Sequence, residues 1–333
     1  MRRGFSHWMR AVFAAANAAA IAATIAALST GVFAQAYPSK PVRLMVPYTP
    51  GAGTDTIARI LAQKAGESLG QQVVIENRPG AGGTIGTEIV AKAPPDGYTL
   101  LFAPTSHAIN PGIYPKLGYD TLKDFAPISI VASLPVVLAV EPSIPATSVK
   151  DLVALAKSKP GALTMASSGN GTVFHLTGEL FKDAAGINMV HVPFKGGAPA
   201  VAALLGGQVS MTFETSVTLL PHIRSGKLRA LGVASAKRIA LLPDVPTLGE
   251  SGFPAILAEN WYGLYAPAGT PKEVIARLYA DLDRAIHSPD VREKLAQQGA
   301  EIRENTPEQT AAFLRSEMAK WARVIKESGA KVD

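Results

Sequence analysis

Three glycine-containing turns are the part of this chain best suited to hold a ligand. They are Pro47–Asp55, Ser167–Thr172 and Phe194–Ala198. Each follows an apolar run typical of a strand and precedes a helix, so free backbone N–H groups lie at a helix N-terminus, where the dipole favours negative charge. Glycine also lets a ligand approach the backbone closely. The turns therefore predict a site for an anionic group.

The same turns can also be read as ordinary strand-to-helix connections, with Asp55 and Thr172 as helix caps. Their recurrence favours a cleft, since ligands of open α/β sheets bind outside the carboxyl ends of strands. Lys195 is the only cation in the three turns, so we expect main-chain N–H groups to hold the anion without an arginine clamp. At the ligand's other end, Glu214 or Asp55 can accept a hydrogen bond from an amine or amide, or disfavour a second carboxylate.

Motifs for nucleotides and cofactors fit poorly. Gly51–Thr54 lacks the spacing and the lysine of a phosphate-binding P-loop. Gly80–Gly86 follows a strand, but its glycine spacing differs from G-x-G-x-x-G, and Asp96 lies in a turn and does not end a strand. We therefore expect no cofactor.

Catalytic and metal-binding constellations are also missing, so we expect a protein that is not an enzyme. The sequence has no cysteine and no G-x-S-x-G motif around Ser168. His175 and Glu179 share a helix face, but without a third ligand they indicate a surface pair and no metal site. His107 is a plausible cleft residue, and His191, in an apolar run, is expected in the core.

The first 36 residues have the pattern of an export signal. Three arginines precede an alanine-rich run that ends in Ala34-Gln35-Ala36, which predicts cleavage after Ala36 or after Ala34 and export to the periplasm, by the Sec route. The alternative is an uncleaved membrane anchor. Cleavage lowers the formal charge from +6 to about +3, and without a basic patch we expect no nucleic-acid partner.

The rest of the chain alternates short apolar runs with amphipathic segments, which predicts an α/β fold with mostly parallel sheets flanked by helices. Strands are expected at 42–47, 73–76, 98–103, 136–140, 163–166, 189–192, 209–213, 228–234 and 261–266, and helices at 55–69, 84–93, 149–158, 173–185, 199–205 and 217–225. The segment between 103 and 136 is expected to be irregular. Thr270, Ser288 and Thr306, each followed by proline, predict three C-terminal helices, with capping boxes at Thr270 and Thr306.

The alternating strands and helices fall into two series, and near Trp261 the chain returns to the first of them. This arrangement predicts two lobes with a ligand cleft between them. Residues 1–36 are the signal peptide, 37–138 plus 261–333 the first lobe, and 139–260 the second lobe. Two chain crossings would let the lobes hinge. We expect a monomer.

Several ordered blocks resemble the Bug-type (TctC-like) periplasmic substrate-binding proteins of tripartite tricarboxylate transporters. The resemblance covers the whole region after the leader and is carried by Pro50–Asp55, Glu76–Gly83, Pro95–Leu100, Lys123–Phe125, Ser168–Thr172, Phe194–Ala200, Gly206–Val209 and Pro243–Thr247. It implies a two-lobed periplasmic binding protein fold of type II-like topology that closes over one carboxylate, held by main-chain N–H groups and hydroxyls.

Carried onto this chain, the resemblance places the ligand between residues of both lobes, with Thr105 and Ser106 near the hinge. With the residues singled out above, the candidate ligand-binding set is Tyr48, Gly51, Ala52, Gly53, Thr54, Asp55, Thr105, Ser106, Ser168, Gly171, Thr172, Lys195, Gly196, Gly197, Ala198 and Glu214.

The chain departs from the family at three positions, with Phe194 where tyrosine is common and Ser210 and Glu214 where aspartate is frequent. The expected function is capture of a small carboxylate-bearing solute, such as an organic acid or amino acid, for a membrane permease. Delivery of the liganded protein to a sensor kinase is the alternative, and a hydrolase on the same fold lacks the nucleophile–base pair it would need.

Overall fold

The computed structural model describes residues 37–330. The chain divides into two units, Met1–Ser39 and Lys40–Asp333. Of the first unit only residues 37–39 are described, and they are irregular. The export signal and its two cleavage positions lie outside the described residues. Every element below belongs to the second unit.

Two sets of parallel strands form the framework, as the alternating pattern predicts. Strand β1 (Val42–Val46) pairs with β2 (Val73–Asn77) and β3 (Thr99–Pro104). In the second set, β5 (Thr164–Ser167) pairs with β6 (Val190–Pro193) and β7 (Met211–Thr215). Parallel neighbours need crossover connections, which helices provide. These are α2 (Gly53–Leu69), η1 (Ala81–Gly83) and α3 (Thr84–Ala91) in the first set, and α6 (Val173–Ala185) and α7 (Gly197–Leu205) in the second.

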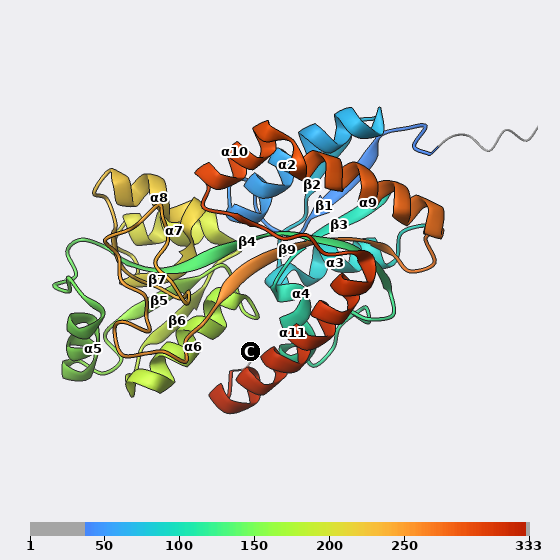
Figure 1. Ribbon diagram of the computed structural model, residues 1–333. Helices are drawn as coiled ribbons and strands as arrows, with labels where there is room; N and C mark the ends of the chain where they lie inside the picture. The colour runs from blue at the N-terminus through green and yellow to red at the C-terminus, as the bar shows by residue number, and fades with distance from the viewer. Residues whose placement is uncertain (1–36, 331–333) are drawn as a thin grey trace, which may run out of the picture. The chain divides into compact units, whose positions relative to one another are not determined.

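One long strand, β4 (Phe125–Val140), belongs to both sets. It pairs antiparallel with β9 (Glu259–Pro267) as far as Pro135, and from Val136 onwards with β7 and with β8 (Arg229–Val233). Figure 1 shows β4 and β9 running side by side between the two groups of elements. Strand β9 also pairs antiparallel with β3, so each parallel set continues into antiparallel crossing strands.

The expectation of an irregular segment between residues 103 and 136 was wrong. This stretch contains α4 (Ser106–Ile113) and the first eleven residues of β4. Its prolines argue against regular structure from sequence, but those of β4 sit at tolerated places, and Pro111 lies inside α4. The register of β4 shifts beside Pro127, and Pro135 is the residue where the partners of β4 change.

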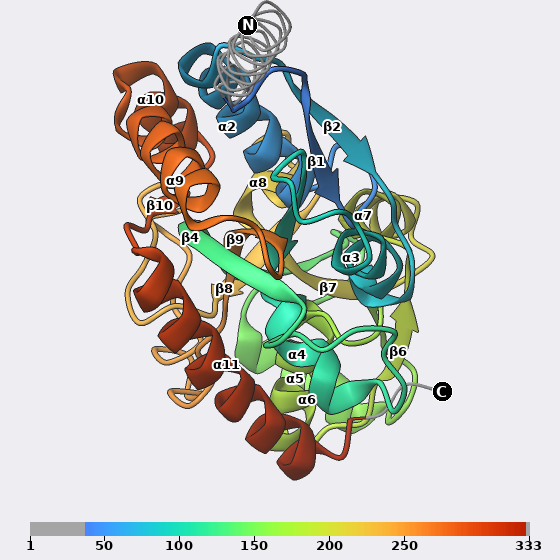
Figure 2. The same ribbon diagram turned by 90° about the vertical axis from the view of Figure 1, so that its right-hand side faces the viewer.

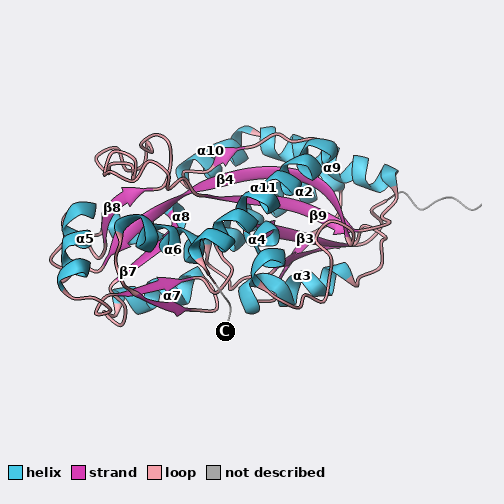
Figure 3. Cartoon of the chain, turned by 90° about the horizontal axis from the view of Figure 1, so that it is seen from below, coloured by secondary structure: helices cyan, strands magenta, loops and turns pink. Residues whose placement is uncertain are grey.

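The remaining helices cover the strands on two sides. They are α5 (Val149–Ser158), α8 (Ser216–Arg224), α9 (Lys272–His287), α10 (Pro289–Gln297) and α11 (Pro307–Ser328), with a short strand β10 (Glu301–Ile302) before α11. Figures 1 and 3 place α9 and α10 on one side of β4 and β9, and α3 and α4 on the other. Figure 2 shows α9 and α10 beside α2. Within residues 37–330, none of the helices combines the length and apolarity needed to cross a bilayer.

One of the two predicted capping boxes is present. The capping box at Thr306 is confirmed, since its hydroxyl accepts from Gln309 N and the Gln309 side chain accepts from Thr306 N. The box at Thr270 was wrong. Its hydroxyl donates to the Pro267 carbonyl at 2.7 Å, and α9 begins without a side-chain cap. Helix α9 begins one residue later than predicted, with Pro271 as its N-cap, so the Thr270 hydroxyl is not the cap.

A buried carboxylate, Asp281, fixes α9 against α2. The side chain of Asp281 is fully buried and accepts hydrogen bonds from Ser68 of α2, at 2.8 Å, and from Arg277 and Arg284 of its own helix. Burial alone would raise the pKa of Asp281, but these hydrogen bonds hold it below its ordinary value. Helix α2 carries the candidate site residues Gly53 and Thr54 at its N-terminus. The hydrogen bond between Ser68 and Asp281 therefore helps to hold these residues in place.

We predict that Asp281→Ala lowers the free energy of unfolding by about 3 kcal/mol at pH 7, because it removes a buried, fully bonded carboxylate. The matched variant Ser68→Ala should cost only about 1 kcal/mol, since it removes a single hydrogen bond. Urea denaturation measures both. The Asp281 effect should shrink at acid pH, as the carboxyl gains its proton; a loss that is equal at pH 7 and pH 3 would contradict this account.

Candidate functional site

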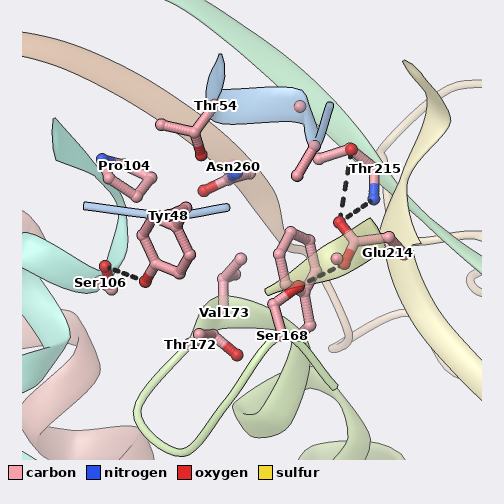
Figure 4. A pocket seen from close by; sticks show the side chains of 14 residues that line it. Tyr48, Thr54, Pro104, Ser106, Ser168, Thr172, Val173, Glu214, Thr215 and Asn260 are labelled. Carbon is pink, nitrogen blue, oxygen red and sulfur yellow. Dashed lines mark hydrogen bonds between the residues drawn. The ribbon is translucent and has the colours of Figure 1, made fainter. Parts of the chain in front are cut away.

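A small cavity of about 20 Å³, here called the inner cavity, lies where strand ends from both parallel sets meet helix N-termini. Figure 4 shows its side chains pointing toward one another from the two sets of elements. Its lining residues are Tyr48, Ala52, Gly53, Thr54, Pro104, Ser106, Ser168, Thr172, Val173, Phe174, Gly197, Glu214, Thr215 and Asn260. Nine of these belong to the sequence-predicted set, and their role in binding stays a prediction.

A second cavity of about 380 Å³, here called the outer cavity, shares Tyr48 and Ser168 with the first. Of the predicted residues it adds Lys195 alone. Its other walls are the glycine turn Gly80–Gly83, Tyr114, the loop residues Gly169 and Asn170, and Pro193 and Phe194. Gly80–Gly83 belong to the glycine-rich segment that the sequence analysis compared with cofactor-binding motifs, and they line the outer cavity.

The remaining predicted residues line neither cavity, and several have other partners. Asp55 accepts hydrogen bonds from Gly51 N at 2.9 Å, from Asn77 at 3.0 Å and from Arg59 at 2.8 Å. These bonds shape the first turn from within. Thr105 accepts from Trp261 N at 2.9 Å and so ties the end of β3 to β9. Gly171, Gly196 and Ala198 are likewise absent from both linings.

Gly196 has a different role from contact with a ligand. A Cβ added to it would lie 2.4 Å from the hydroxyl of Thr49, in the turn before α2. Glycine is therefore needed at this point for the third turn to approach the first.

Five lining residues were missed by the sequence reading: Pro104, Val173, Phe174, Thr215 and Asn260. Four of them adjoin predicted elements, so extending each candidate loop by a residue or two would have found them. Asn260 comes from the crossing strand β9, and its side-chain oxygen accepts from Thr105 N, 155 positions earlier. A single sequence contains no signal for that pairing.

The N-terminus of α2 supplies unpaired donors to the inner cavity. Its N-cap, Ala52, has no capping side chain, and the first bond of the helix ladder is Thr56 N to Ala52 O. The N–H groups of Gly53 and Thr54 therefore have no partner within the helix. A Cβ on Gly53 would lie 2.8 Å from Thr215 Oγ1, so glycine is required for this close approach.

Tyr48 fixes the wall between the two cavities. Its hydroxyl lies 2.8 Å from the Gly82 carbonyl oxygen and 2.8 Å from Ser106 Oγ. A carbonyl oxygen only accepts, so the single Tyr48 proton lies toward Gly82 and the Ser106 hydroxyl donates to Tyr48. Burial raises the pKa of Tyr48 well above its ordinary value, which keeps this proton in place.

Glu214 is the acid of the inner cavity, with 2 % of its surface exposed. Its Oε1 accepts from Thr215 N at 2.9 Å, and its Oε2 forms a short hydrogen bond with Ser168 Oγ. Burial raises the pKa of Glu214 from 4.5 to about 7, although the bonds from Ser168 and Thr215 act in the opposite direction. Its charge therefore changes near neutral pH.

The histidines singled out from sequence lie outside both cavities. His107 was a plausible cleft residue, but it is fully buried between Tyr119, Phe125 and Tyr265, and burial lowers its pKa to about 3. His175 stacks on His191, with ring centroids 4.1 Å apart. Within residues 37–330 there is no cluster of three or more side chains suited to a metal ion.

We predict that Glu214→Gln makes the protein more stable at pH 8 by up to about 3 kcal/mol, with little effect at pH 4.5. The folded state keeps the Glu214 proton up to about pH 7, whereas the unfolded state loses it near 4.5, so wild-type stability falls as pH rises through this interval. Urea denaturation at the two pH values measures the difference.

Glu179→Gln is the matched control for this experiment. Glu179 pairs with Lys182 at 2.8 Å outside the cavities and should give no gain at pH 8. A Glu214→Gln gain that is the same at both pH values would contradict the prediction.

Comparison with known proteins places the chain among solute-binding proteins. A family model described as "Tripartite tricarboxylate transporter family receptor" matches residues 57–330. The solved structure of the periplasmic binding protein BugD is 37% identical, with a TM-score of 0.86 over 89% of this chain and 99% of that one.

Two similar structures contain carboxylates. Rpa4515 of R. palustris, solved with adipate, is 36% identical, with a TM-score of 0.86 over 89% of this chain and all of the other. MatC of Rhodopseudomonas palustris, solved with malate, is 34% identical, with a TM-score of 0.83 over 87% of this chain and all of the other. The predicted Bug-type resemblance and the two-lobed α/β fold are thereby confirmed.

Proposed function

Because the chain belongs to the tripartite tricarboxylate transporter family receptors, we propose that it is an exported, non-catalytic binding protein that captures a small carboxylate-bearing solute. The observation that carries the proposal is the inner cavity, where the unpaired N–H groups of Gly53 and Thr54 meet hydroxyls from the opposite set of strands. Adipate and malate in two similar structures support a carboxylate as the ligand. The liganded protein would then dock on a membrane permease in the periplasm.

Capture would use closure of two lobes, 37–138 with 261–333 and 139–260. The change of partners on β4 between Pro135 and Val136 supports a hinge on the crossing strands. Loops of the two halves already touch across the outer cavity, where the Tyr114 hydroxyl donates to the Asn170 carbonyl at 3.2 Å. Once closed, water is excluded and each charge-assisted N–H bond to the carboxylate gains strength.

Isothermal titration of the mature protein against mono-, di- and tricarboxylates and amino acids tests the proposal. We expect at least one carboxylate to bind with a Kd of about micromolar or below, since several charge-assisted bonds contribute. Well-folded protein that binds none of these ligands would refute it. Native mass spectrometry of the freshly purified protein identifies any solute that is carried through.

Gly82 offers a test of closure. It has a φ of +61°, and a Cβ added to it would lie 2.3 Å from the Asn170 carbonyl oxygen of the other half. We predict that Gly82→Ala weakens ligand binding at least about tenfold, because the closed form would have to open to admit the methyl group.

Gly186→Ala is the matched control for the closure test. Gly186 has a φ of +60° and nothing within 4 Å of an added Cβ. It should show the same backbone strain, of about 1 kcal/mol, with unchanged affinity. Equal affinity of the two variants would mean that the contact between Gly82 and Asn170 contributes nothing to closure. Titration gives the affinities, and thermal unfolding gives the strain.

A further inference from the structure

The inner cavity contains an acid and no base. Glu214 is the only carboxylate that lines it, and no lysine, arginine or histidine is among its described lining residues. A ligand carboxylate entering this space would therefore meet a buried negative charge with no protein cation to offset it. Two like charges at close range in a poorly solvated site disfavour each other strongly. Either Glu214 must take up a proton or the ligand must bring a positive group.

Burial disfavours the charge of Glu214, but its hydrogen-bond donors favour the ionised form. Thr215 N and Thr215 Oγ1 both direct hydrogens at Oε1, at 2.9 and 3.4 Å, and Ser168 Oγ bonds to Oε2. The N-terminus of α7 also faces this carboxylate, since a Cβ on Gly197 would lie 2.7 Å from Oε2. Donors and a positive helix end stabilise a carboxylate over a carboxylic acid. Glu214 thus lies beside the start of α7, the turn Gly196–Ala198.

Ser168 and Ser106 are consequently acceptors toward a ligand. Each hydroxyl has one hydrogen, and in this state Ser168 gives its hydrogen to Glu214 while Ser106 gives its hydrogen to Tyr48. Only their lone pairs remain for a bound molecule. The Glu214 side of the inner cavity therefore offers two acceptor groups, Glu214 and Ser168, and requires hydrogen-bond donors from the ligand; Ser106 is a third acceptor, beside Tyr48.

The opposite side offers donors. The N–H groups of Gly53 and Thr54 at the start of α2 suit a carboxylate. Thr215 lies between the two sides, bonded to Glu214 and 2.8 Å from the position of a Cβ on Gly53. The anionic and cationic groups of a matching ligand must therefore be close together, as they are in an amino acid.

We propose that the ligand of this site is an amine-bearing carboxylate, whose carboxylate binds the N-terminus of α2 and whose ammonium binds Glu214 and Ser168. The inference rests on the proposed function and narrows its ligand class. The rest of the ligand extends past Tyr48 and Ser168, the two residues that both cavities share, into the outer cavity. Glu214 is then the residue that selects for the amine.

Isothermal titration with matched ligand pairs tests this at pH 8, where Glu214 is ionised. The pairs are alanine with propionate, aspartate with succinate, and glutamate with glutarate, which differ only in the amine. We expect the best-bound amine ligand to exceed its partner at least about tenfold in the wild type. Glu214→Gln should abolish this advantage, and Glu179→Gln, outside the cavities, should keep it.

A second measurement needs no variant. Between pH 6 and pH 8 the wild-type affinity for the amine ligand should rise, because Glu214 loses its proton over this interval while the amine keeps its own. The affinity for the matched dicarboxylate should fall over the same interval. Tyr48 and Tyr262 also face this region, but burial raises the pKa of each well above this range, so neither titrates.

Two results would overturn the inference and leave general carboxylate binding intact. One is tighter binding of succinate or glutarate than of its amine partner at pH 8. The other is an amine preference that survives in Glu214→Gln. Absence of binding for every ligand in both proteins would instead refute the proposed function and this inference together.

Discussion

The structure depends on one strand that two sheets share. Because β4 pairs with β9 along its first part and with β7 and β8 along its last five residues, the two parallel sets cannot be placed independently. Their strand ends, and the helices that start there, meet at the inner cavity. A site assembled from turns far apart in the chain therefore rests on a single hydrogen-bonded ladder, with Thr105 and Asn260 joining β3 to β9 at its edge.

The placement of one carboxylate then determines the polarity of the cavity. Glu214 draws the hydrogen of Ser168 toward itself and lies beside the start of α7, while the N–H groups at the start of α2 remain available to an anion. Hydroxyls that would otherwise donate to a carboxylate become acceptors. The chemistry of the site is thus set by proton positions as well as by residue types. Because the charge of Glu214 changes near neutral pH, the proton positions in the cavity depend on pH.

Sequence reasoning succeeded where a local physical cause dominates. Helices α5 and α6 have their predicted bounds because Ser148 and Thr172 cap them with their own side chains. It failed where distant contacts decide. Phe125–Pro135 is a strand because β9, more than 120 positions later in the chain, pairs with it despite its prolines. In the site, the turns were found but not the roles of Asp55, Asn260 and Ser168, which depend on partners in the fold.

The two ends of the inner cavity differ in what mutation can change. The carboxylate-binding end consists of main-chain N–H groups of Gly53 and Thr54; steric crowding keeps glycine at position 53, and at position 54 every residue type except proline presents the same group. The opposite end consists of the side chains of Ser168 and Glu214. After gene duplication, single codon changes there can redirect the protein to a new solute while the anion anchor is inherited intact. This fold can therefore change its ligand specificity while it keeps its ability to bind a carboxylate.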